Sequence, residues 1–127
     1  MEKIKIFYED TDASGRVYYA NYLKYLERGR TKFLYQLGLN HNELRNKLNI
    51  IFVVKDCNIE FKKPVFFEDQ IKVKTKIINF SKVKIIFSQK IFKEKEIIID
   101  SIITIVPINN SGKITFIPDR ILKLFKI

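Results

Sequence analysis

Hydrophobic and polar positions repeat with two different periods along this chain. Between residues 19 and 37 apolar side chains recur every three or four positions, which predicts one long amphipathic helix. From Ile51 onward the period becomes two, which is typical of strands with one buried face and one solvated face. The pattern therefore predicts a long helix followed by a sheet, an α+β fold.

The predicted helix has two features on its apolar face that need a packing explanation. Gly29 lies there, where glycine costs about 1 kcal/mol relative to alanine, so we expect another backbone segment to approach closely. Arg30 projects from the same side and either extends its head group to water or pairs with a carboxylate. Gly38 is expected to end the helix at about Leu37. The apolar face comprises Tyr19, Tyr22, Leu23, Leu26, Gly29, Phe33 and Leu37.

The period-two region divides into strands at its turn signals. No helical pattern separates the four long strands that follow the helix, so we expect an antiparallel meander. Residues 41–49, between the helix and these strands, are expected to form a short helix or an irregular connector. The strands are predicted at Lys3–Tyr8, Ile51–Phe61, Phe66–Asn79, Lys82–Phe92, Glu96–Pro107 and Ile114–Ile117, with a terminal helix from Pro118 to Phe125.

Length and composition limit the class of protein. The 127 residues, 46% of them apolar, suit one domain over residues 1–127 with a modest core. No apolar run is long enough to span a membrane, and the N-terminus lacks the apolar segment of a signal peptide. The single Cys57 allows no internal disulfide and fits a reducing compartment. We therefore expect a soluble, cytoplasmic protein.

The net charge of +10 suggests a nucleic-acid-binding domain as one alternative. The sequence contains no basic block, RNA-binding signature or arginine cluster interleaved with aromatic residues. Lysine, isoleucine, asparagine and phenylalanine are all plentiful and all have A/T-rich codons, so compositional drift accounts for much of the charge. We therefore expect no nucleic-acid partner.

The segment before the helix contains a cluster of acidic and small residues. Asp10, Asp12, Ser14 and Gly15 reproduce the start of a calcium-binding loop, but Asn21 occupies the position that requires a bidentate glutamate. The chain has one histidine, which excludes a multi-histidine zinc site, so we expect no metal. The aspartates then either shape an Asx turn and cap the helix, or supply a reactive carboxylate beside a helix N-terminus.

A longer string favours the reactive carboxylate. Residues 10–30, D-T-D-A-S-G-R-V-Y-Y-A-N-Y-L-K-Y-L-E-R-G-R, closely resemble the signature of the YbgC-like acyl-CoA thioesterases, relatives of the 4-hydroxybenzoyl-CoA thioesterase in the hotdog-fold superfamily. The resemblance implies a curved antiparallel sheet wrapped around one long central helix. It also implies hydrolysis of an acyl-CoA thioester to free acid and coenzyme A, without a metal or redox cofactor.

The same resemblance implies roles for residues of the acidic turn. Asp12 matches the catalytic carboxylate, which acts as a nucleophile or as a general base. Tyr19 matches the position whose backbone N–H, at the first turn of the helix, polarises the thioester carbonyl; the positive end of a helix dipole suits that role. Many relatives have histidine there, but the backbone donor survives the change. Gly15 lets the turn approach the substrate. Tyr18 and Asn21 are candidate substrate contacts, with packing as the alternative role for Tyr18.

The same resemblance implies which residues contact coenzyme A and how copies of the chain associate. Relatives carry basic side chains near the turn between the third and fourth strands and near the C-terminal segment, where this chain has Lys82, Lys84 and Lys113; a solvated face is the alternative role for these lysines. Hotdog proteins associate edge to edge, so we expect a homodimer or homotetramer with the site at the protomer interface. The main alternative function is a non-catalytic module that binds acyl-CoA or acyl-carrier protein.

Overall fold

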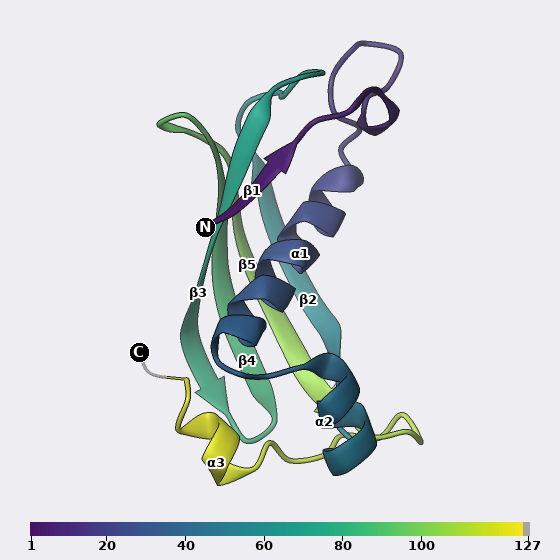
Figure 1. Cartoon of the computed structure of the whole chain (residues 1–127), viewed down its shortest axis with the longest axis vertical. Helices are drawn as coiled ribbons and strands as arrows, with labels where there is room; N and C mark the ends of the chain where they lie inside the picture. Colours follow the sequence, from purple (N-terminus) through teal and green to yellow (C-terminus); the bar gives the residue numbers. More distant parts are fainter. Residues whose placement is uncertain (126–127) are drawn as a thin grey trace. The chain divides into compact units, whose positions relative to one another are not determined.

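The computed structural model describes residues 1–125 of the chain (Figure 1). Its elements confirm the predicted order of a short strand, a long helix, a connector and four long strands. They are β1 (Glu2–Lys5), a 3-10 turn (Tyr8–Asp10), α1 (Asn21–Gln36), α2 (His41–Leu48), β2 (Ile51–Phe61), β3 (Gln70–Ser81), β4 (Lys84–Lys93), β5 (Glu96–Ile108) and α3 (Asp119–Leu122). Within residues 1–125, no helix is both long and apolar enough to cross a bilayer.

Several boundaries differ from the predictions; β3, for example, begins at Gln70 rather than at Phe66 and ends at Ser81 rather than at Asn79. β1 ends at Lys5, because residues 8–10 turn into a 3-10 helix instead of continuing the strand. The strand expected at Ile114–Ile117 is reduced to one isolated bridge with Ile108. α3 covers only residues 119–122 of the predicted terminal helix.

The order of the strands corrects the expected meander. Within the described residues, the five strands follow the order β1-β3-β4-β5-β2, and β1 pairs antiparallel with β3. Two-residue turns at 82–83 and 94–95 join β3, β4 and β5 as consecutive hairpins, as predicted. β2 instead lies at the edge of the sheet, beside β5. Residues 62–69, between β2 and β3, are longer than a hairpin loop and contain Pro64, so they do not hold these two strands as neighbours.

The chain forms two compact units, one of residues 1–32, 59–75 and 89–101, the other of residues 33–58, 76–88 and 102 onward. In the first unit, the buried face of helix α1 keeps Tyr22, Leu26 and Gly29 of the predicted stripe but is shifted around the helix. Leu23 is 48% exposed and Tyr19 is 63% exposed, whereas Tyr25 is buried. Tyr19 is exposed because it precedes the helix, which begins at Asn21. The buried positions are residues 22, 25, 26, 29 and 30, which keep helical spacing but are centred one residue away from the predicted stripe.

Gly29 allows α1 to pack closely on β3 and β4 in the first unit. A Cβ at this position would lie 2.6 Å from Val73 Cγ1, 3.0 Å from Thr75 Oγ1 and 3.1 Å from Gln89 Nε2. The close approach expected at Gly29 is therefore present, although its partners are side chains rather than another backbone. A side chain here would push the helix away from the sheet.

Gln89 ties α1 to the sheet by hydrogen bonds beneath Gly29. Its amide donates to the Leu26 carbonyl at 2.8 Å and to Thr75 Oγ1 at 2.9 Å, and its oxygen accepts from Arg30 Nη1 at 2.9 Å. Gln89 is fully buried and Arg30 is 9% exposed, so Arg30 does not extend its head group to water. An unsatisfied buried polar group costs about 1–3 kcal/mol, so these bonds favour one placement of the helix over β4.

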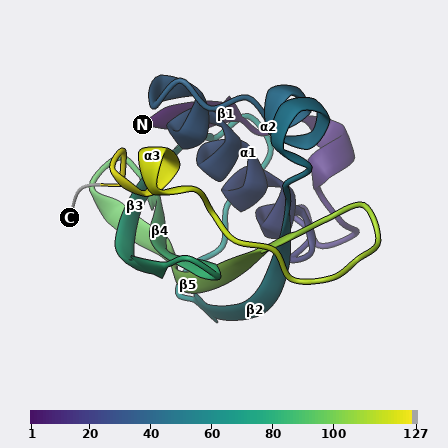
Figure 2. The ribbon, with the colours of Figure 1, turned by 90° about the horizontal axis from the view of Figure 1, so that it is seen from below.

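The second unit has its own core and a capped helix. Phe33 packs edge-on against Phe87, with ring centroids 6.0 Å apart, and Phe80 packs likewise against Phe125 at 5.7 Å. Asn40 caps α2 by accepting hydrogen bonds from two backbone N–H groups of its first turn. Figure 2 shows α2 and α3 of this unit from below the view of Figure 1.

We expect Gly29→Ala to destabilise the protein, because the added methyl group overlaps Val73. Overpacking costs about 1–3 kcal/mol, and the better helix propensity of alanine, about 1 kcal/mol, offsets only part of it. Urea unfolding measures the difference, with Lys24→Ala on the exposed face of α1 as the matched control. The cost of Gly29→Ala should shrink when it is measured in a Val73→Ala background. A Gly29→Ala protein as stable as the parent would contradict the packing described here.

Candidate active site

The acidic turn is a tight loop closed by backbone hydrogen bonds. Thr11 and Val17 form an antiparallel bridge, and the Asp12 N–H donates to the Arg16 carbonyl at 2.8 Å. The Gly15 N–H then donates back to the Asp12 carbonyl at 3.0 Å. Gly15 has a φ of +80°, which side-chain-bearing residues adopt rarely. The glycine is therefore needed for the shape of the turn; its approach to a substrate stays a prediction.

The Asp12 carboxylate is held through one of its two oxygens. Oδ1 accepts from the Ser14 N–H at 2.8 Å and from Ser14 Oγ at 2.5 Å. These bonds hold the pKa of Asp12 below its usual range, and the bond from the Ser14 hydroxyl has the larger effect. No group within residues 1–125 donates to Oδ2. The Asx turn is thus present, and it leaves one oxygen of an ionised, exposed carboxylate available.

Asp10 connects the acidic turn to the start of α1. Its carbonyl accepts two hydrogen bonds, from the Tyr18 N–H and from the Asn21 side-chain amide, both at 2.9 Å. Its carboxylate accepts from the Phe7 N–H at 2.9 Å. Asn21 therefore braces the loop from the first residue of the helix. Its predicted role as a substrate contact is a separate one and stays a prediction.

Tyr19 and Ala20 present two backbone N–H groups just before α1. The following N–H groups are used in a tight turn, since those of Asn21, Tyr22 and Leu23 donate to the carbonyls three residues earlier. No acceptor within the described residues bonds to the N–H of Tyr19 or of Ala20. The predicted donor position is thus corrected in one respect, because Tyr19 lies two residues before the helix rather than in its first turn.

Exposed aromatic rings gather near the acidic turn; sequence analysis assigned Tyr18 and Tyr19 to the site, but not Tyr8, Phe61, Phe66 or Phe67. Tyr19 packs against Tyr18 at 5.0 Å and edge-on against Phe61 at 6.3 Å between ring centroids. Arg16 lies over the Phe66 ring, 5.5 Å from its centroid. The segment F-K-K-P-V-F-F at residues 61–67, three aromatic residues around a proline, was the available signal. We call Tyr8, Tyr18, Tyr19, Phe61, Phe66 and Phe67 the aromatic cluster; each is at least 40% exposed.

Tyr25 is a further residue near the acidic turn that sequence analysis did not assign to the site. It is 3% exposed, and its hydroxyl makes no hydrogen bond of ordinary geometry within residues 1–125. Burial, and after it the negative charge and the hydrogen-bonding oxygens of Asp10, raise the pKa of Tyr25 well above its usual value. The hydroxyl therefore stays protonated and is available as a donor toward Asp10.

The three predicted coenzyme A contacts lie in the second unit, whereas the acidic turn lies in the first. Lys82 belongs to the β3–β4 turn and is exposed, and Lys84 begins β4 and is half-buried. Lys113 is exposed and follows the turn at residues 109–112. Their role stays a prediction. In residues 1–125 no three or more His, Cys, Asp and Glu side chains gather as metal ligands do.

Comparison with known proteins identifies the family to which this chain belongs. A model of the thioesterase-like superfamily matches residues 8–125. The acyl-CoA thioesterase YbgC of Haemophilus influenzae is 33% identical over 90 residues, which cover 71% of this chain and 66% of that protein. A putative esterase of Aquifex aeolicus is 33% identical over 120 residues, covering 94% of this chain and 91% of that protein.

Solved structures agree with the sequence matches. A probable thioesterase from Bartonella henselae has a TM-score of 0.89 and 30% identity, and the match covers 92% of this chain and 97% of that one. The matched part of this chain spans just under two thirds of the length of the Haemophilus protein. The chain belongs to the thioesterase-like superfamily and has its hotdog fold.

Proposed function

We propose that this protein hydrolyses acyl-CoA thioesters, with Asp12 as the reactive carboxylate and the Tyr19 N–H as oxyanion donor. The observation that carries the proposal is that the acidic turn holds an ionised carboxylate with one oxygen available, in the same loop as a backbone N–H that has no acceptor. Family membership supports the reaction class. The motif that assigns Asp12 and Tyr19 is independent of this geometry, and the geometry is compatible with both roles.

Two routes lead to the same products. In the first, Asp12 Oδ2 attacks the thioester carbon, the C–S bond breaks, and coenzyme A leaves as a thiolate that takes a proton from solvent. Water then hydrolyses the mixed anhydride and restores the carboxylate. In the second, Asp12 takes a proton from a water whose oxygen attacks the carbonyl, and this proton passes to the leaving thiolate. The Tyr19 N–H stabilises the developing oxyanion in both routes.

The hydrogen bonds from Ser14 help to keep Asp12 ionised on acidification, because they lower its pKa. Both routes use the ionised carboxylate. A lower pKa weakens a carboxylate as a base and as a nucleophile alike, so both routes stay part of the proposal.

Assembly of copies is part of the proposal. β2 is an edge strand along which most residues are exposed, and an unpaired edge is suited to pairing with a second sheet. The aromatic cluster includes Phe61, the last residue of β2. We therefore keep the homodimer or homotetramer, with the site at the protomer interface, as the expected form. We also propose a cytoplasmic location and coenzyme A contacts by Lys82, Lys84 and Lys113, both on the basis of the sequence.

Asp12→Asn should lower turnover of acyl-CoA thioesters by at least about a hundredfold, since the amide keeps the shape and the Ser14 bonds but loses the reactive oxygen. Release of thiol, followed with a thiol-reactive dye over short-chain, long-chain and aromatic acyl-CoA substrates, measures the effect. Glu9→Gln is the matched control, because Glu9 is an exposed carboxylate just before the same turn.

The activities of the parent protein and the two variants distinguish the possible roles of Asp12. Full activity in a folded Asp12→Asn protein would refute the role of Asp12. No turnover by the parent protein, together with saturable binding of acyl-CoA, would favour the non-catalytic binding module. An equal loss in Glu9→Gln would mean that negative charge near the turn, rather than the Asp12 oxygen, is what matters.

Ser14→Ala should move the acid limb of the pH–rate profile to higher pH. Removing the Ser14 hydroxyl takes away the main cause that lowers the Asp12 pKa, so the carboxylate becomes protonated at a higher pH. Activity needs the ionised form and is therefore lost earlier on acidification, while the rate at neutral pH changes less. The pH dependence of kcat/KM, measured beside Ser111→Ala as an exposed control, tests this. An acid limb that does not move would contradict control of Asp12 by Ser14.

A further inference from the structure

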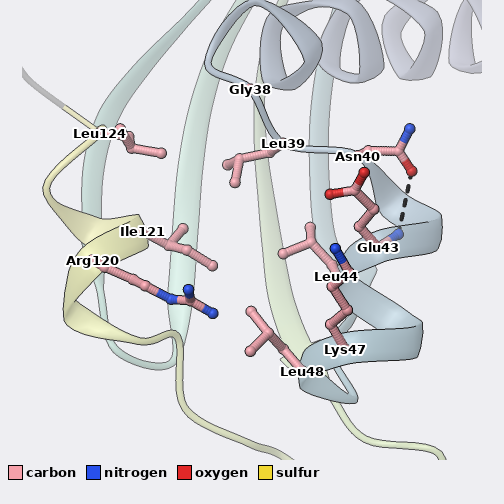
Figure 3. Close-up of a pocket in the computed structure, with 10 residues that line it drawn as sticks. All are labelled: Gly38, Leu39, Asn40, Glu43, Leu44, Lys47, Leu48, Arg120, Ile121 and Leu124. Carbon is pink, nitrogen blue, oxygen red and sulfur yellow. Dashed lines mark hydrogen bonds between the residues drawn. The ribbon is translucent and has the colours of Figure 1, made fainter.

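The second unit contains a cavity of about 300 Å³ that shares no residue with the acidic turn. It is bounded by the segment after α1, by α2 and by α3 (Figure 3). Its volume is at the lower end of the range of small-molecule sites, about 300–1,000 Å³. The lining residues are Gly38, Leu39, Asn40, Glu43, Leu44, Lys47, Leu48, Arg120, Ile121 and Leu124.

One part of the lining is continuous apolar surface. Leu39, Leu44 and Ile121 are each less than 10% exposed, and they come from three different segments of the chain. Leu48 follows Leu44 by one helical turn and extends the same face of α2. In Figure 3 the side chains of these leucines and of Ile121 point into the space between α2 and α3. Such a wall accommodates a short aliphatic chain.

The other part of the lining is charged and has a net positive charge. Arg120 extends from α3 toward α2, and Lys47 runs along the cavity from the last turn of α2 (Figure 3). Neither cation has a salt-bridge partner within residues 1–125. Glu43 is the acidic residue of the lining, one turn before Lys47 on the same helix. Two cations against one carboxylate leave a charge of about +1 for a ligand to neutralise.

We infer that this cavity binds a medium-chain aliphatic carboxylate, with the chain on the leucine and isoleucine wall and the carboxylate on Arg120 and Lys47. The guanidinium group suits a carboxylate because it donates two parallel hydrogen bonds. The small volume favours a chain of about eight carbons over a long fatty acid. The inference is independent of the proposed function, although the ligand is of the chemical class that thioester hydrolysis would release.

Binding of sodium octanoate to the full chain, followed by backbone amide chemical shifts in NMR, tests the inference. Saturable shifts should concentrate at residues 38–48 and 119–124. 1-Octanol, which has the same chain without the charge, should bind about tenfold more weakly. Repeating the titration with Asp12→Asn separates this cavity from the acidic turn, because the shifts at residues 38–48 should be unchanged in that variant.

Substitutions at three exposed residues should change the affinity for octanoate in different ways. Arg120→Gln should weaken octanoate binding about tenfold, because it removes a charged hydrogen-bond donor. Glu43→Gln should strengthen it, because it removes the repulsive carboxylate. Lys24→Gln, a cation of α1 outside the cavity, should leave it unchanged. The inference is overturned if octanoate does not bind saturably, if Arg120→Gln binds as the parent does, if octanol binds equally well, or if the shifts centre on residues 12–21.

Discussion

The close packing of α1 at Gly29 is the constraint on which the first unit depends. A helix can lie this near to Val73 and Gln89 only where it has no side chain, so the glycine sets the separation. Gln89 then favours one register, because its amide group bonds to the Leu26 carbonyl and to Arg30 inside the core. Shape and hydrogen bonding thus act on the same turn of the helix.

The position of the acidic turn follows from that of the helix. Asn21 is the first residue of α1 and bonds to the Asp10 carbonyl, which also accepts from Tyr18. The loop is therefore attached at the point where the helix begins. Inside the loop, Gly15 and Ser14 determine the direction of the Asp12 carboxylate. The segment after β2 also holds the loop, since the Val17 N–H donates to the Val65 carbonyl at 2.8 Å and Arg16 forms a bridge with Phe66.

The sequence predicted what depends on local pattern and failed where distant segments meet. The limits of β2 were read correctly, because its period-two pattern and Pro64 are local signals. Its place beside β5 was not predicted, since pairing between strands far apart in sequence leaves no mark in one chain. Asp12 and Tyr19 were predicted as site residues through a continuous motif. Gln89 and Phe61 were missed because each meets the helix region from about 40 to 60 residues away.

The exposure of the site bears on how it would work. In the single chain Asp12 is exposed to solvent, where an oxyanion gains little from one backbone N–H because the dielectric constant is high. Catalysis of this kind requires a drier environment. The aromatic cluster around Tyr19 is apolar surface beside the unpaired edge of β2, so the surface that an assembled form would cover is also the surface that the chemistry needs covered. Association and activity should therefore depend on the same residues, and weakening the edge should reduce turnover before it affects the fold of the chain.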